Sequence, residues 1–359
     1  MKRIHQRDLE HILAHTEALW NDLRGGRIFI TGGTGFFGKW LLESFAWANE
    51  RLALKAQATV LTRNIDNLTK AAPHLTTNPS IRFHTGDIRN FDFPAGSYSH
   101  IIHAAATAAE ATFNNEKPLD KFDNIVGGTR RTLDFAVHCN AQRFLFTSSG
   151  PVYGRQPEDV SHIAEDFPGT PNPNDREAVL GESKRSSEFL CHFYAAQYGF
   201  SASIARCFSF VGPHLQLDIH YAIGNFIRNA LRGEPIHVNG DGTPVRSYLY
   251  AADLMIWLWT LLFRAQSQRA YNVGSEESIT IGELAYLIAG LAEPPLPVLI
   301  TAQPGTKTAT NRYIPSTRRA QNELGLRQHM SLVESVRRTM AFHKNTSTTE
   351  VRLPIGIGS

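Results

Sequence analysis

Three glycines spaced three residues apart form the first stretch of this chain that could do chemistry. The sequence reads TGGTGFFG, with glycines at Gly32, Gly35 and Gly38. Glycine lets backbone N–H groups approach a ligand more closely than a residue with a Cβ atom allows. Where such a turn leads from a strand into a helix, the N–H groups and the helix N-terminus bind a dinucleotide pyrophosphate. The stretch therefore predicts a dinucleotide-binding turn.

The residues after the second predicted strand bear on which dinucleotide fits. An acidic residue there would bind the ribose 2′-hydroxyl of NAD, but the sequence reads LTRN, with Arg63 at its third position. Arg63 could pair with the 2′-phosphate of NADP, stack on the adenine or face solvent. Asp87 and Ile88, at the end of the third predicted strand, could flank the adenine, although an Asp after glycine is also a common turn residue. The sequence thus predicts NAD and leaves NADP open because of Arg63.

These residues need elements that hold them in place, and strand and helix patterns alternate along the first two thirds of the chain. Apolar runs predict strands at 27–31, 58–62, 81–88, 100–106, 143–149 and 201–210. Helical patterns lie between them at 39–52, 124–139 and 176–199. The alternation predicts an α/β fold, with a Rossmann-type, doubly wound parallel sheet and right-handed crossovers.

The two ends of the chain follow other patterns. Residues 8–23 predict an added amphipathic helix, with Asp8 as its N-cap, that packs on the body or on a partner subunit. Beyond residue 212, glycine and proline punctuate shorter elements and predict a smaller lobe of loops and helices, in which Trp257 and Trp259 are expected to be core residues. The expected division is a helical extension at 1–24, a dinucleotide-binding domain mainly at 25–210, a substrate lobe with interleaved elements at 211–345 and a flexible tail at 346–359.

Composition excludes several classes of function. The 359 residues are 42% hydrophobic, with a net charge of only +3 and both signs mixed along the chain. Neither a nucleic-acid-binding stripe nor a membrane span is expected, and the N-terminus is too polar for a signal peptide. The three cysteines, Cys139, Cys191 and Cys207, show no metal-ligand spacing. We therefore expect a cytoplasmic protein without a metal.

The order of several motifs resembles the extended short-chain dehydrogenase/reductases, in particular the NAD-dependent nucleotide-sugar epimerase/dehydratase family. The resemblance covers about residues 27–338. After TGGTGFFG it rests on GDI at 86–88, HAAA at 103–106, NIVGGT at 124–129, TSSGPVYG at 147–154, GESK at 181–184, VGP at 211–213 and GDGTPVRSYLYAADL at 240–254. Each motif alone is weak evidence, but the ordered set is specific for this fold and for chemistry on a nucleoside-diphosphate sugar (NDP-sugar).

The resemblance implies a role for each matching residue. Lys184 and Ser149 would be catalytic, and Lys184 would also bind the nicotinamide ribose. The other cofactor-binding residues would be Gly32, Gly35, Phe36, Phe37, Gly38, Arg63, Asp87, Ile88, Ala104, Ala105, Ala106 and Asn124. The NDP-sugar would contact Thr107, Ser149, Ser209 and Arg246. Two simpler interpretations stand beside these roles, a surface ion pair for Arg246 and a strand-end cap for Ser149.

The sequence departs from the family at the proton-transferring residue. In similar enzymes a tyrosine four residues before the lysine takes the proton of the sugar hydroxyl, and here that place holds Leu180. General-base catalysis typically contributes about 10²–10⁴-fold, so its loss slows the step without forbidding it. A water held by Ser149 and Lys184 could substitute. Tyr153, Glu182 and Asp175 are side-chain candidates because they lie close in sequence.

Two further departures affect the sugar pocket. The 4,6-dehydratases of the family carry an Asp-Glu pair directly after the Ser/Thr, and here those places hold Gly150 and Pro151. Neither side chain can transfer a proton, which disfavours ordinary dehydration. Ser209 and Phe210 stand where similar proteins often have an Asn. This second change alters the pocket without pointing to a particular sugar.

The leading hypothesis is an enzyme that uses a nicotinamide dinucleotide to oxidise C4 of an NDP-sugar. The reaction would either stop at the 4-keto sugar or continue to the 4-epimer. A 4,6-dehydratase is one alternative, and a non-catalytic homologue that binds NDP-sugar or cofactor is another, motivated by Leu180. The resemblance also implies a homodimer formed through the helices predicted at 124–139 and 176–199, although the apolar faces of these helices could instead only cover the sheet.

Overall fold

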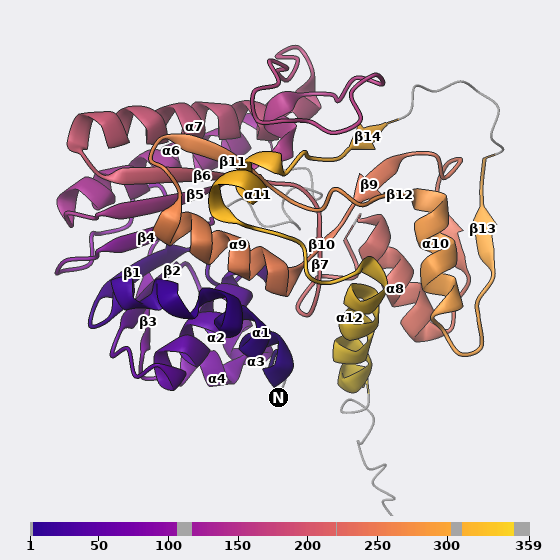
Figure 1. Ribbon diagram of the computed structural model, residues 1–359, viewed down its shortest axis with the longest axis horizontal. Helices are drawn as coiled ribbons and strands as arrows, with labels where there is room; N and C mark the ends of the chain where they lie inside the picture. Colours follow the sequence, from indigo (N-terminus) through magenta and orange to yellow (C-terminus); the bar gives the residue numbers. More distant parts are fainter. Residues whose placement is uncertain (1–2, 106–116, 220, 303–310, 348–359) are drawn as a thin grey trace, which may run out of the picture.

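A parallel seven-stranded sheet forms the centre of the larger part of the molecule (Figure 1). The computed structural model describes residues 3–105, 117–219, 221–302 and 311–347. Within these residues the strand order is β11-β6-β5-β4-β1-β2-β3. The strands are β1 (Arg27–Thr31), β2 (Gln57–Thr62), β3 (Ile81–Thr85), β4 (His100–His103), β5 (Arg143–Ser149), β6 (Ser201–Cys207) and β11 (Arg269–Val273). Every neighbouring pair is parallel, which confirms the predicted doubly wound α/β fold.

Several strands end earlier than the sequence predicts. β3 ends at Thr85 and β4 at His103, so the GDI and HAAA motifs begin at or beyond the carboxyl ends of their strands. Open parallel sheets bind their ligands at this edge, in the crevice where the strand order reverses. Here the order reverses between β1 and β4. The glycine-rich turn after β1 lies at this reversal point.

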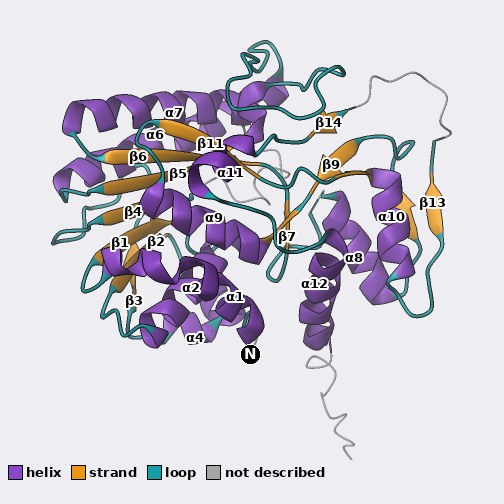
Figure 2. Ribbon diagram, in the orientation of Figure 1, coloured by secondary structure: helices purple, strands orange, loops and turns teal. Residues whose placement is uncertain are grey.

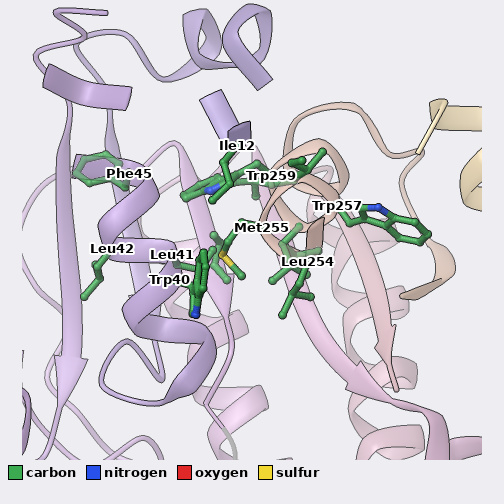
Figure 3. Packing of buried hydrophobic residues seen from close by; sticks show 14 of the residues in the cluster. Ile12, Trp40, Leu41, Leu42, Phe45, Leu254, Met255, Trp257 and Trp259 are labelled. Carbon is green, nitrogen blue, oxygen red and sulfur yellow. The ribbon is translucent and has the colours of Figure 1, made fainter. Parts of the chain in front are cut away.

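Two helical layers cover the sheet (Figure 2). α6 (Pro118–His138) and α7 (Val179–Tyr198) pack together on one face. α2 (Phe36–Arg51) and α9 (Ala251–Arg264) pack together on the other, where α3 (Asp66–Ala71) and α4 (Pro73–Thr76) follow β2. Trp257 and Trp259 of α9 are buried, as predicted (Figure 3). Trp259 donates a hydrogen bond to Ser44 Oγ at 2.9 Å. This core supports β1 and the glycine turn from the α2 and α9 face of the sheet.

The N-terminal segment packs on the body of the protein. It forms α1 (Gln6–Thr16) and a 3₁₀ helix, η1 (Glu17–Leu23), against α9. The predicted N-cap was wrong, because the helix is capped by His5, three residues before Asp8. Asp8 is buried, accepts a hydrogen bond from Tyr250 Oη at 2.7 Å and pairs with Arg338. The Asp8 carboxylate therefore binds Tyr250 and Arg338 and does not cap the helix.

A smaller lobe lies beyond the carboxyl edge of the sheet. It contains the helices α8 (Ala222–Arg232), α10 (Ile281–Gly290) and α12 (Leu332–Ser347), and α11 (Arg318–Leu324) returns towards β11 (Figure 1). Elements of the range expected for this lobe interleave with the large domain, since α9 and β11 belong to the layers of the central sheet.

The smaller lobe also contains short strands that the sequence did not predict. β9 (Val245–Ser247) lies between β12 (Ser278–Thr280) and β14 (Arg312–Tyr313). β8 (Ile236–Val238) pairs with β13 (Val298–Ile300), and β7 (Phe210–Val211) pairs with β10 (Leu249–Tyr250). Strands of two or three residues are too short to show an alternating pattern. No helix among the described residues is long and apolar enough to cross a membrane.

Candidate active site

The glycines of this turn are of two kinds. Gly32 and Gly38 are packed too closely against backbone for any side chain, whereas Gly35 faces open space. Gly32 has a φ of +74°, and a Cβ there would lie 2.5 Å from the Ala104 carbonyl. A Cβ on Gly38 would lie 2.2 Å from the Gly33 carbonyl carbon. Gly35 is exposed, and a Cβ there would meet nothing nearer than the Gly32 carbonyl oxygen at 3.5 Å, an ordinary contact. No neighbour requires glycine at position 35, so the space beside it fits the close approach of a ligand.

The turn leads directly into α2. Gly35 is the N-cap, and Phe36 and Phe37 are the first two helical residues. The N–H groups of a first helical turn have no partner within the helix, and the helix dipole favours an anion there. The Phe37 ring lies edge-on to Phe210, with centroids 5.1 Å apart. The turn therefore has the donors that a pyrophosphate needs, beside the first strand of the smaller lobe.

The residues expected at the adenine lie together at the ends of β2 and β3. Arg63 is exposed after β2. The Asp87 carboxylate accepts a hydrogen bond from Arg89 Nε at 2.9 Å, and this partner lowers the pKa of Asp87. A Cβ on Gly128 would lie 2.8 Å from Ile88, so the GDI and NIVGGT motifs pack against each other. Sequence reasoning missed Arg89, which adds a second guanidinium at this edge.

A neutral histidine ties the turn to α6. His103 Nδ1 lies 2.7 Å from Thr31 Oγ1, and His103 Nε2 lies 3.0 Å from Thr129 Oγ1. Burial, and next the charge of Lys184, lower the pKa of His103 to about 3, so the imidazole stays uncharged. Thr31 Oγ1 also accepts a hydrogen bond from Ala105 N at 3.1 Å. The sequence singled out the HAAA motif but not this bridge.

The other residues expected near the nicotinamide are placed only in part. Ala104 and Ala105 follow β4 and are half-buried, and Asn124 is half-buried in α6. Ala106 and Thr107, which the sequence assigns to cofactor and substrate, lie outside the described residues.

Lys184 is buried in the second turn of α7. Its Nζ donates a hydrogen bond to the Thr147 carbonyl at 2.7 Å, and burial lowers the pKa of the amine to about 8. Leu180 lies one turn earlier and is half-buried. A Cβ on Gly181 would lie 2.5 Å from the Pro151 carbonyl oxygen, so the GESK and TSSGPVYG motifs meet closely. Lys184 therefore lies in a long helix beside the end of β5, as the motif predicts, and aliphatic Leu180 stands where the tyrosine would be.

Ser149 is the last residue of β5, and its backbone pairs with Cys207 of β6. The side chain of Tyr313, from β14 of the smaller lobe, lies next to Ser149, and the Ser149 side chain favours the ionised form of the phenol. Burial raises the pKa of Tyr313 strongly, so the phenol is neutral at physiological pH. No motif marked Tyr313, because it stands in a two-residue strand.

Tyr153 belongs to a separate buried network. Its hydroxyl donates to Asn272 Oδ1 at 2.7 Å and accepts from Arg206 Nη1 at 2.9 Å. Burial raises the pKa of Tyr153 to about 12. Arg206 forms an ion pair with Glu188 at 2.7 Å, and Glu188 also accepts a short hydrogen bond from Ser148. These contacts give Tyr153 a structural role.

The two acidic candidates also lie elsewhere. Asp175 is exposed, and its carboxylate caps a short 3₁₀ helix, η3 (Arg176–Ala178), through Glu177 N at 2.9 Å. Glu182 lines a surface groove between α6 and α7 together with Arg185. Both residues therefore lie at the protein surface.

Two of the four residues expected to bind substrate, Ser209 and Arg246, lie at or on short strands of the smaller lobe. Ser209 directly precedes β7, and its carbonyl accepts a hydrogen bond from Leu249 N at 3.0 Å. Arg246 of β9 is half-buried, and its Nη1 donates to the carbonyls of Val245 and Asn311, both at 2.9 Å. Burial lowers the pKa of Arg246. The guanidinium is thus anchored by backbone carbonyls beside the site.

No group of three or more His, Cys, Asp or Glu side chains that could hold a metal occurs within the described ranges. The three cysteines are buried and unpaired with one another.

The fold and this arrangement of motifs define a class. The chain belongs to the NAD dependent epimerase/dehydratase family, whose model matches residues 28–274. This membership confirms the resemblance predicted from the ordered motifs. It also confirms NAD as the expected cofactor, and the donors at the α2 N-terminus and the open side of Gly35 fit that group.

Individual relatives are similar over most of their length. UDP-glucuronic acid decarboxylase 6 of Arabidopsis thaliana is 30% identical, over 86% of this chain and 86% of the relative. UDP-glucuronic acid decarboxylase 5 of the same plant is 29% identical, over 89% and 92%. Two solved structures share the fold. They are a UDP-glucuronic acid 4-epimerase of Bacillus cereus (TM-score 0.74, 20% identity, covering 89% of this chain and 99% of that one) and a dTDP-glucose 4,6-dehydratase of Bacillus anthracis (0.70, 19%, 90% and 98%).

Proposed function

We propose that this protein is an NAD-dependent enzyme that oxidises C4 of an NDP-sugar, ending at the 4-keto sugar or returning it as the 4-epimer. The observation that carries the proposal is the placement of Lys184. Its buried ammonium group is anchored on the Thr147 carbonyl, two residues before Ser149. Burying an amine so that its pKa falls to about 8 is unfavourable for folding, which favours a functional reason for the residue.

The cofactor would lie along the carboxyl edge of the sheet. The glycine turn and the first N–H groups of α2 would hold the pyrophosphate, and the residues after β2 and β3 would contact the adenosine. Ala104, Ala105, Asn124 and Lys184 would contact the nicotinamide end. Bound NAD would supply the oxidant that accepts the hydrogen leaving C4 with its electron pair.

The substrate would enter from the side of the smaller lobe. Arg246 supports binding of the diphosphate, because a forked guanidinium suits phosphate oxygens. Ser149 would hydrogen-bond the reacting hydroxyl. UDP-glucuronic acid is the first substrate to test, because the named plant relatives act on it. A carbonyl at C4 would be β to the C5 carboxylate, so oxidation of this sugar would also favour loss of CO₂.

Two alternatives remain from the sequence. Gly150 and Pro151 offer no side-chain proton donor or base, which argues against a 4,6-dehydratase. A non-catalytic binding protein is favoured by one observation, the aliphatic Leu180. Such a protein would bind NDP-sugar without changing the redox state of its cofactor.

We also propose a homodimer, in a reducing cytoplasmic location. The outer faces of α6 and α7 form a groove that is lined partly by Phe122, Val126 and Leu190, and the nearby Phe189 and Phe193 are exposed by 60% and 54%. Light scattering should give twice the monomer mass, and Phe189→Asp should give the monomer.

The decisive experiment starts from purified protein with nothing added. Any dinucleotide released by denaturation is identified, and absorbance at 340 nm is followed while UDP-glucuronic acid, UDP-glucose or dTDP-glucose is added. We expect bound NAD and its reduction by one of these sugars. Release of NADP would assign Arg63 to the 2′-phosphate. A protein that binds NDP-sugar but never reduces NAD would establish the non-catalytic alternative.

A further inference from the structure

Tyr313 is held in place by contacts from both parts of the molecule. Its strand runs parallel to β9, with Tyr313 opposite Arg246. The next residue donates its backbone N–H to the buried side chain of Gln156 at 2.9 Å. The ring packs on Phe208, with centroids 4.7 Å apart. The phenol therefore has a defined position before any substrate arrives.

The space for this phenol exists because residue 150 has no side chain. A Cβ at Gly150 would lie 2.4 Å from Tyr313 Oη and 2.8 Å from two ring carbons. These distances are shorter than carbon atoms tolerate, so any side chain there would displace the ring. Gly150 directly follows Ser149, and its small size lets the Tyr313 phenol lie next to the Ser149 side chain. Two departures from the family pattern, Leu180 and Gly150, thus accompany a phenol beside Ser149.

We propose that Tyr313 supplies the phenol hydroxyl that Leu180 cannot, and that Ser149 and Tyr313 together transfer the proton of the reacting sugar hydroxyl. The inference rests on the proposed C4 oxidation. In that step the C4–H bond breaks and its hydrogen leaves with the electron pair to NAD. The sugar O–H bond breaks, its proton passes to Ser149 Oγ, and the Ser149 hydroxyl proton passes to the oxygen of the neighbouring Tyr313. Tyr313, which is half-buried, releases its own hydroxyl proton to water.

The surroundings of Tyr313 favour the neutral phenol, which can relay a proton, over a tyrosinate that would act as a base from the start. Burial strongly disfavours the tyrosinate, whereas the neighbouring Ser149 side chain and the charge of Arg246 favour it. Burial is the largest effect, so the phenol rests in its neutral form. A neutral relay gives a smaller advantage than a tyrosinate, towards the lower end of the roughly 10²–10⁴-fold range of general-base catalysis. We therefore expect a slow enzyme.

The test compares three variants of the NAD-loaded protein, with the sugar nucleotide that reduces the wild type as probe. Tyr313→Phe keeps the ring and its packing and removes only the hydroxyl. We expect kcat to fall about 100-fold while KM and the NAD content stay within about threefold. Tyr313→Phe combined with Leu180→Tyr places a phenol one turn before Lys184, and we expect it to regain at least tenfold in kcat. Tyr153→Phe is the matched control, with kcat within about threefold of wild type.

Three outcomes would overturn the inference, and they are distinguishable. If Tyr313→Phe retains wild-type kcat, Tyr313 transfers no proton while the proposed function stands. If only KM rises, Tyr313 packs against the sugar and does no more. If the wild type reduces NAD with none of the NDP-sugars, the proposed function fails and the Tyr313 relay fails with it.

Discussion

A Cβ atom at position 150 would lie 2.4 Å from the Tyr313 hydroxyl oxygen, so Gly150 and Tyr313 can occupy their places only as a pair. We expect Gly150→Ala to displace the ring, to lower stability by about 1–3 kcal/mol through overpacking and to reduce kcat as much as Tyr313→Phe does. Urea unfolding of Gly150→Ala, Tyr313→Ala and the double variant should give a coupling energy above about 1 kcal/mol. Equal costs of Gly150→Ala in both backgrounds would show that the contact carries no energy.

Substitutions in the glycine turn should affect stability and cofactor binding differently, depending on which glycine is changed. Gly35 has a φ of −78°, so alanine is allowed there, and we expect Gly35→Ala to change the free energy of unfolding of the NAD-free protein by less than about 1 kcal/mol. It should raise the Kd for NAD at least tenfold, about 1.4 kcal/mol, because the methyl group occupies the open side of the turn. Gly38→Ala is the contrasting variant and should unfold the protein, since its Cβ meets backbone at 2.2 Å. Unchanged NAD binding by Gly35→Ala in titration calorimetry would place the pyrophosphate elsewhere.

Lys184 should destabilise the cofactor-free protein at neutral pH. Burial lowers the pKa of its amine from 10.5 to about 8, so the charged form is disfavoured in the folded state. Below pH 8 the amine is charged in both states and the full cost applies, up to about 3 kcal/mol. Between pH 8 and 10.5 the unfolded chain binds more protons, so stability from this group rises with pH. We expect Lys184→Met to be more stable than wild type at pH 7, by less than 3 kcal/mol because the Thr147 carbonyl loses its donor, and to lose this advantage towards pH 10.

Activity of the same variant supplies the control. Lys184→Met should lower kcat by at least about 100-fold, whatever its melting temperature. A variant that is less stable than wild type at pH 7 and at pH 10 alike would mean that the hydrogen bond to Thr147 outweighs the burial of the charge.

Tyr153 should behave as a structural residue. Tyr153→Phe removes the hydroxyl that joins Asn272 to Arg206 and leaves both buried partners with one bond fewer. We expect a loss of about 1–3 kcal/mol in chemical denaturation and a kcat within about threefold of wild type. The pattern is the reverse of that expected for Tyr313→Phe. A large loss of kcat at unchanged stability would instead make Tyr153 the substitute for the missing tyrosine.

The sequence predicted most elements of the central sheet and nominated several residues of the candidate site, because those residues lie on long, regular segments. The glycine turn, Ser149 and Lys184 each stand at the end of a buried strand or in a long helix, where hydrophobic periodicity and motif order are informative. Tyr313 could not be found in this way. Its strand has two residues, and its place depends on pairing with β9 and on the absent Cβ of a residue 163 positions earlier in the chain.

Other misses have the same origin in tertiary contacts. Asp8 has the right residue type for a helix cap, yet Tyr250 and Arg338 bind its carboxylate from segments more than 200 residues away. His103 stood in a motif, but its role as a neutral bridge depends on Thr31 and Thr129, which the fold brings to either side of it. Local patterns carry no information on such partners.

The contact of Asp8 with Tyr250 and Arg338 has a consequence for where this folding unit begins and ends. The stretch that matches the family, residues 28–274, leaves out both Asp8 and Arg338. It also leaves out Ile12 and Trp20, which are buried in the same core as Trp259. A protein cut at the borders of the family model, residues 28 and 274, would expose that core to water. The folded domain is therefore larger than the stretch that the family model matches.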